Sequence, residues 1–339
     1  MKDYLSLLIV VCLLTGCEQA RFNDDITKAY GLPDRSAEYQ DLITRDPKNL
    51  SEDELYNRVL TLWDTPYREL NLPTSAGTTH IIISGPADGE TLILLHGMNA
   101  DSTMWYPNVK ALSKRYRVYA IDDILGPGKS KLDQAEDSIE TVIDWYFEIF
   151  DTLKLEKTIL VGASQGGWIA TNLALSKPER FHKLILLSPA QTLTWLEPSV
   201  DILSNLLFAI NPQRDGLRNN LATLSSNVDG IDQLYIDQFF RTITTASTSP
   251  LLMDMKPFDD KQLAALTMPV LFLVGDDDLF NNQDSVDRAI KIMPCVQAEI
   301  ISDSGHFISV DQAELVNEKI VEFVATKQNQ HLTTCKKII

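Results

Sequence analysis

The sequence predicts an α/β fold, a mostly parallel open β-sheet flanked by helices and interrupted by a helical cap. Short apolar runs ending near glycine alternate with helical patterns through residues 66–327. Most of these runs are apolar without alternation, which is typical of strands covered on both faces. Between residues 191 and 268 the strands stop, and an insertion of this kind is expected over the carboxyl edge of the sheet, where ligands bind.

The elements follow in order along the chain. The expected strands are residues 79–85, 91–97, 116–122, 157–163, 183–190, 269–276 and 296–302. The expected helices are residues 103–114, 138–155, 166–177, 285–293 and 311–327, with cap helices at 195–210 and 231–243. This pattern divides the fold into a first core part, 66–190, a cap, 191–268, and a second core part, 269–327. A tail, 328–339, follows.

Residues 17–65 are polar and helical in pattern and carry no catalytic motif. The sequence Ser51–Glu54, "SEDE", predicts a capping box that opens a helix toward Trp63. We therefore expect this segment to be a tether and packing element that holds the body away from a membrane.

The composition limits the class of ligand. The chain of 339 residues is 44% hydrophobic and 23% charged, which is ordinary for a globular protein. Its net charge of −17 argues against nucleic acid as a partner, because phosphate binding requires a basic surface. A small, neutral or weakly charged substrate is favoured.

The first residues predict export. Lys2 is followed by an apolar run, residues 5–14, that is too short to span a bilayer, so a signal peptide over residues 1–16 is expected. The sequence "LTGC" ending at Cys17 resembles a bacterial lipobox, which implies lipid anchoring at Cys17. Glu18 stands where the inner-membrane retention pattern has aspartate, which favours the outer membrane. The alternative is an ordinary secretory signal.

If Cys12 is removed with the signal peptide and Cys17 is lipidated, Cys295 and Cys335 are left, and they either pair and join the tail to the body or stay free thiols. Neither has the spacing of a metal ligand, so no metal site is expected.

A candidate nucleophile lies after the fourth expected strand. Ser164 stands between Gly162 and Gly166 in a G-x-S-x-G pattern, with a strand before it and a helix after it. The glycines permit a sharp turn close to neighbouring backbone, and the helix N-terminus favours developing negative charge. Taken alone, this motif does not distinguish a nucleophile from a polar residue in a tight turn.

The base and acid follow in the order that such a serine needs. Among five histidines, His306 lies in the loop after the last expected strand, from where it can reach Ser164. Of the acids after the preceding strand, Asp278 is the favoured partner of His306 and Asp276 the alternative.

An oxyanion hole is predicted from the backbone N–H groups of Met98, in the turn after a strand, and Gln165, next to the serine. His96 is expected to order that turn rather than to take part in the chemistry. Asp122 and Asp123 are assigned no catalytic role. Four cap aromatics either line an acyl pocket or only pack, namely Phe208, Tyr235, Phe239 and Phe240.

The motifs "HGM", "GASQGG", "GDDDLF" and "SGHF" resemble those of α/β-hydrolases from about Tyr67 to Val324. The stretches "WDTPY", "SGP" and "STMWYPN" are similar to small bacterial carboxylesterases, which implies hydrolysis of a small-molecule ester without a metal or organic cofactor. Thioesters, lactones and C–C bonds are alternatives for the same triad. A non-catalytic binding lipoprotein is the alternative of another class.

Overall fold

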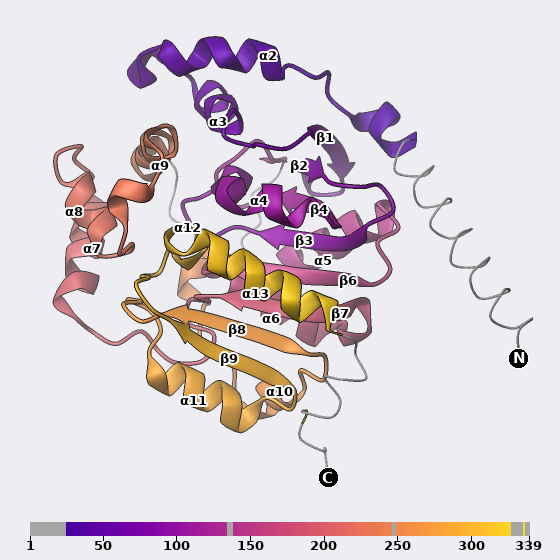
Figure 1. Ribbon diagram of the computed structural model, residues 1–339, viewed down its shortest axis with the longest axis vertical. Helices are drawn as coiled ribbons and strands as arrows, with labels where there is room; N and C mark the ends of the chain where they lie inside the picture. Colours follow the sequence, from indigo (N-terminus) through magenta and orange to yellow (C-terminus); the bar gives the residue numbers. More distant parts are fainter. Residues whose placement is uncertain (1–24, 134–137, 246–248, 327–334, 336–339) are drawn as a thin grey trace, which may run out of the picture.

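The computed structural model describes residues 25–133, 138–245, 249–326 and Cys335 (Figure 1). The predicted signal peptide and the predicted lipidation site, Cys17, lie outside these residues. No helix in the described part has the length and hydrophobicity needed to cross a bilayer.

A single twisted sheet carries the fold. Its strands are β1 (Tyr67–Thr74), β2 (Gly77–Ser84), β3 (Glu90–Leu95), β4 (Tyr116–Ile121), β5 (Lys131–Leu132), β6 (Thr158–Ala163), β7 (Phe181–Leu187), β8 (Val270–Gly275) and β9 (Val296–Ile301). The strand order is β1-β2-β4-β3-β6-β7-β8-β9, with β5 paired to β2. The neighbouring strands β4, β3, β6, β7, β8 and β9 pair in parallel. The pairs β1–β2, β2–β4 and β2–β5 are antiparallel.

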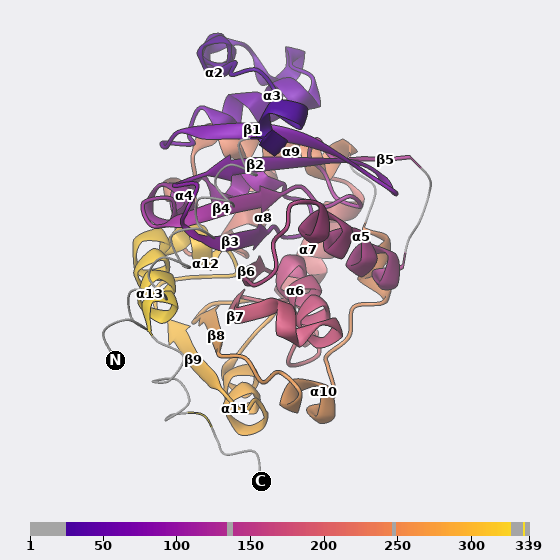
Figure 2. The ribbon, with the colours of Figure 1, turned by 90° about the vertical axis from the view of Figure 1, so that its right-hand side faces the viewer.

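Helices cover both faces of the sheet. They are α2 (Ser36–Tyr39), α3 (Glu52–Leu60), α4 (Tyr106–Leu112), α5 (Ile139–Thr152), α6 (Gln165–Ser176), α10 (Asp260–Ala264), α11 (Gln283–Ile292), α12 (Ile308–Asp311) and α13 (Ala313–Ala325). One apolar core lies between the sheet and α5, α6, α10 and α11, and a second lies against α3, α4 and α13. Figure 2 shows α5 and α6 on one side of the sheet and α4 and α13 on the other.

Three helices form the cap between β7 and β8: α7 (Val200–Ile210), α8 (Leu217–Ala222) and α9 (Gln233–Thr245). In Figure 1 they lie at the left, at the carboxyl ends of the central strands. Helix α9 contributes Tyr235 and Phe239 to the second core, so the cap is packed onto the sheet domain.

The N-terminal segment is integrated into this body more closely than a tether would be. Helix α3 packs along α9, and Arg58 Nη2 lies 2.9 Å from Asp237 Oδ2 with both side chains buried. Arg241 of α9 donates to the carbonyl oxygens of Pro47 and Leu50. The capping box of Ser51 and Glu54 is present. In the described residues, the segment therefore serves to hold the cap against the body.

Cys295 and Cys335 form a disulfide. Of the two arrangements left open by the sequence, the structure has the one in which the tail is joined to the body, directly before β9.

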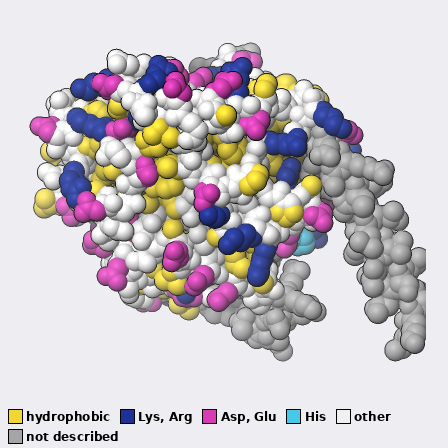
Figure 3. All heavy atoms as spheres, turned by 45° about the horizontal axis from the view of Figure 1, so that its top comes forward, with side chains coloured by type: hydrophobic (Ala, Val, Ile, Leu, Met, Phe, Trp, Pro, Cys, Tyr) yellow, Lys and Arg dark blue, Asp and Glu magenta, His cyan; other side chains and the backbone are white. Residues whose placement is uncertain are grey.

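The surface mixes charges of both signs. On the face shown in Figure 3, Lys and Arg side chains alternate with Asp and Glu, and hydrophobic side chains are exposed among them.

Candidate active site

Ser164 occupies a strained turn between β6 and α6. Its backbone has φ 52° and ψ −121°, a conformation that non-glycine residues rarely adopt. Neighbouring backbone is very close, because a Cβ on Gly162 would lie 2.3 Å from the carbonyl oxygen of Gly166, and one on Gly166 would lie 2.3 Å from that of Leu95. Only glycine fits at these two positions. The turn therefore presents the Ser164 side chain at the carboxyl edge of the sheet.

His306 connects the serine to an acid. Its Nε2 lies 2.8 Å from Ser164 Oγ, and its Nδ1 lies 2.9 Å from Asp278 Oδ1. Since an ionised carboxylate only accepts hydrogen bonds, Nδ1 carries the proton and Nε2 accepts from the serine hydroxyl. The structure thus brings the three predicted side chains into one hydrogen-bonded chain.

The two acids considered for this position have different partners. Asp278 accepts from His306, from the backbone N–H of Phe280 and from Asn281 Nδ2. Asp276 instead accepts from the N–H groups of Asp303 and Ser304, which belong to the loop that carries His306. Asp278 orients the imidazole, whereas Asp276 shapes the loop.

The turn after β3 approaches the serine closely. A Cβ on Gly97 would lie 3.2 Å from Ser164 Cβ, and Met98 lines the same cavity as Ser164. His96 Nε2 accepts from the N–H of Asp123, which leaves the proton on Nδ1 to bond the carbonyl oxygen of Gly97. His96 therefore fixes this turn. Gln165 begins α6, and an N–H at the first helical position has no acceptor within its own helix.

An apolar cavity of about 370 Å³ opens above Ser164 and His306, lined mainly by hydrophobic side chains of α7, α9 and the loops around them. Of the four cap aromatics, Phe208, Tyr235 and Phe239 line it, and Phe240 does not. A cavity of this kind suits an uncharged, apolar substituent.

Two buried polar clusters near the site were not predicted. In the first, His80 bridges Glu69 and Asp122, each at 2.9 Å, and Lys129 contacts Glu69. Burial lowers the pKa of His80, but its hydrogen bonds to both carboxylates outweigh this and raise the pKa above its usual value. Burial raises the pKa of Glu69, but its bonds to His80 and Lys129 bring that pKa down to about 2.

The second cluster joins Asp101 and Thr103, just after the Met98 turn, to Gln238 of α9. Burial, followed by the nearby Asp122, raises the pKa of Asp101 to about 6. Because Gln238 is distant in sequence, no spacing pattern indicates this contact. Among the described residues, no group of three or more His, Cys, Asp or Glu side chains is arranged to hold a metal.

Known proteins share this architecture. Residues 90–232 match the model of the alpha/beta hydrolase fold family. The chain is 32% identical over 276 residues to the uncharacterized carboxylesterase nap of Bacillus subtilis, covering 80% of this chain and 91% of the relative. It is 31% identical over 277 residues to carboxylesterase YbfK of the same organism, covering 80% and 92%.

The crystal structure of naproxen esterase from Bacillus subtilis superposes with a TM-score of 0.75 at 30% sequence identity, covering 81% of this chain and 99% of that one. The chain therefore belongs to the α/β-hydrolase family, as a hydrolase of the carboxylesterase type.

Proposed function

We propose that the protein cleaves small-molecule carboxylic esters through an acyl-enzyme on Ser164. The observation that carries this proposal is the hydrogen-bonded chain from Ser164 Oγ through His306 to Asp278 at the floor of an apolar cavity. A serine, a base and an acid in this geometry are the elements of acyl transfer.

The proposed reaction has two steps. His306 Nε2 takes the proton of Ser164 as Oγ attacks the ester carbonyl, and Asp278 stabilises the resulting imidazolium. The N–H groups of Met98 and Gln165 bind the oxyanion. The C–O bond breaks, the alcohol leaves with the proton from His306, and water releases the acid by the same route. Every group in these two steps belongs to the chain, to the ester or to the attacking water.

Turnover of p-nitrophenyl esters of increasing acyl length tests the proposal, with Ser164→Ala beside the wild type. We expect turnover that is lost in the variant and that declines once the acyl chain exceeds the cavity. Hydrolysis of thioesters or lactones in place of these esters would assign the protein a different substrate class. Turnover that persists in Ser164→Ala would contradict the mechanism.

We further propose that the protein is exported and anchored by lipid at Cys17, most simply in the outer membrane. The lipobox-like sequence and Glu18 support this proposal. The Cys295–Cys335 disulfide independently supports export, though not lipidation, because disulfides persist in oxidising compartments. Metabolic labelling with a fatty acid should mark the wild type and not Cys17→Ala. An unlabelled wild type recovered in the soluble periplasmic fraction would point to an ordinary secretory signal.

A further inference from the structure

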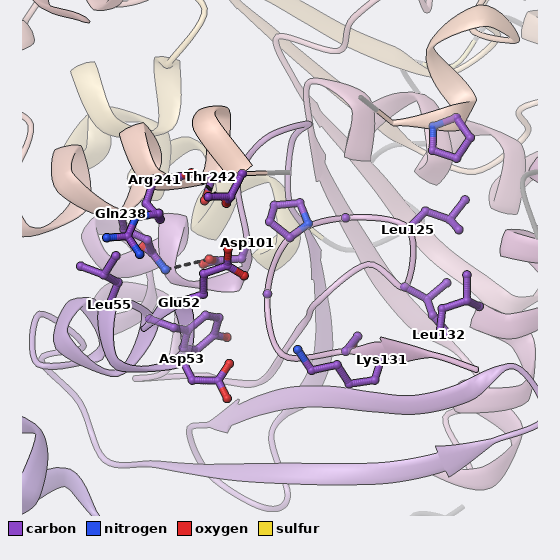
Figure 4. A pocket seen from close by; sticks show the side chains of 18 residues that line it. Glu52, Asp53, Leu55, Asp101, Leu125, Lys131, Leu132, Gln238, Arg241 and Thr242 are labelled. Carbon is purple, nitrogen blue, oxygen red and sulfur yellow. Dashed lines mark hydrogen bonds between the residues drawn. The ribbon is translucent and has the colours of Figure 1, made fainter. Parts of the chain in front are cut away.

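A second cavity, of about 500 Å³, lies between α3, α9 and the loop around Gly126 (Figure 4). It shares no lining residue with the cavity above Ser164. Helix α9 separates the two, because it gives Tyr235 and Phe239 to the catalytic side and Gln238 and Thr242 to the other. The segment 97–101 completes the wall, with Gly97–Ala100 on the catalytic side and Asp101 on the other.

Asp101, Thr103 and Gln238 form a closed ring of contacts in this wall, which we call the Asp101 ring. Thr103 Oγ1 lies 2.6 Å from Asp101 Oδ1 and 2.8 Å from Gln238 Oε1. Gln238 Nε2 lies 2.7 Å from Asp101 Oδ2, the contact drawn as a dashed line in Figure 4. All three side chains are buried.

The ring contains three contacts and needs three protons. The amide of Gln238 supplies one and the hydroxyl of Thr103 supplies one, because a hydroxyl has a single proton. Rotating the amide by 180° only moves the unfilled contact to the pair Gln238 Oε1 and Asp101 Oδ2. In either orientation the third proton has to come from the carboxyl group of Asp101.

We infer that Asp101 is a positioning residue, a neutral carboxylic acid that closes the Asp101 ring and so holds the segment 97–101, which carries the Met98 N–H, against cap helix α9. The inference rests on the proposed function, because the ring acts through the Met98 N–H that is proposed to bind the oxyanion. When Asp101 loses its proton, one contact of the ring is left with two oxygen atoms facing each other without a hydrogen, and only the hydrogen bond from the Gln238 amide still joins this segment to α9.

The surroundings favour the neutral acid. Burial and Asp122 raise the pKa of Asp101, against the hydrogen bonds from Thr103, which lower it. Arg241 lines the same cavity, but its guanidinium donates to two backbone carbonyls. The other titratable groups that face Asp101 or its cavity are Glu52, Asp53 and Tyr56 of α3, Tyr235 of α9 and Lys131 of β5.

The Asp101 ring responds to pH. A carboxyl with a pKa near 6 keeps its proton in mild acid and loses it toward pH 8. The contribution of the ring to catalysis is therefore present at low pH and falls as the pH rises.

Asp101→Asn tests this, because an asparagine amide supplies the third proton of the ring at every pH. Infrared difference spectra of wild type minus Asp101→Asn would report the carbonyl stretch of the protonated acid between pH 5 and 8. In parallel, kcat for p-nitrophenyl butyrate would be measured for both proteins. Glu52→Gln, which removes a carboxyl from the same cavity outside the ring, is the matched control.

We expect a protonated-acid band that Asp101→Asn removes and Glu52→Gln keeps. The ratio of wild-type to Asp101→Asn kcat should fall about fivefold as this band titrates, the factor that corresponds to one neutral hydrogen bond. Absence of the band at every pH, or a ratio that stays flat while the band titrates, would overturn the role of Asp101. Absence of turnover in the wild type would overturn the proposed function as well, whereas turnover with a flat ratio would leave that function standing.

Discussion

At the scale of single residues, the site depends on the hydrogen bonds that hold each side chain in one orientation. Asp278 is held by Phe280 and Asn281 as well as by His306, so its carboxylate keeps the imidazole in one orientation. Its neighbour Asp276 is turned toward the backbone of the loop. Two acids separated by one residue therefore have separate roles.

Exchanging each acid for its amide should separate these roles. Asp278→Asn should lower kcat by about four orders of magnitude, because an amide at this position favours the wrong imidazole tautomer. Asp276→Asn keeps one acceptor for the loop and should cost less than about tenfold. Steady-state kinetics on one ester compares them directly, and equal losses in the two variants would contradict the assignment of Asp278.

At the scale of elements, buried ion pairs connect segments that are distant in sequence. Arg58 of α3 and Asp237 of α9 are both buried, and Arg214 adds a second contact to Asp237. On the opposite side of α3, Tyr56 reaches Asp122 and His80. The N-terminal segment thus links the edge of the sheet to the cap.

Arg58→Met should destabilise the protein by about 3 kcal/mol, because it leaves the Asp237 charge buried with fewer partners. Arg218→Met is the matched control, since its partner Asp229 is also an aspartate but both side chains are mostly exposed. That variant should change stability by less than about 1 kcal/mol. Urea denaturation measures both, and similar midpoints for the two variants would refute the link between α3 and α9.

The His80 cluster should make stability depend on pH. Because the pKa of Glu69 is lowered to about 2, its contribution is present above the ordinary value of 4.5 and is lost as the pH falls toward 2. The pKa of His80 is raised, so its protonated imidazole stabilises the fold at low pH. This contribution to stability is lost as the pH rises through the raised pKa. Glu69→Gln should flatten the loss of stability between pH 4.5 and 2, measured by urea midpoints. An unchanged acid limb would contradict this account.

At the scale of the whole molecule, the sequence patterns predict the buried parallel strands and the catalytic order well, because continuous apolar runs and strand-end motifs are local signals. These patterns do not predict strand β1, because its buried and exposed residues do not alternate regularly at the sheet edge. The fit of α3 against the cap depends on pairs such as Arg58 and Asp237, 179 residues apart, and local periodicity cannot report such contacts.

The disulfide acts at this scale, since it closes a segment with a sequence separation of 40 residues. Cys335→Ser should lower the free energy of unfolding by about 2 to 4 kcal/mol, as expected when a long loop is no longer constrained. A reductant should shift the wild-type midpoint and leave that of Cys335→Ser unchanged. An equal response of both proteins to the reductant would contradict a stabilising role for this bond.

Covalent labelling tests most directly whether Ser164 is the nucleophile. The protein would be incubated with a fluorophosphonate and digested, and the modified peptide identified by mass spectrometry. We expect one label per chain on Ser164, loss of ester turnover in step with labelling, and no label in Ser164→Ala. Well-folded protein that remains unlabelled, or a label on another residue that accompanies the loss of turnover, would contradict it.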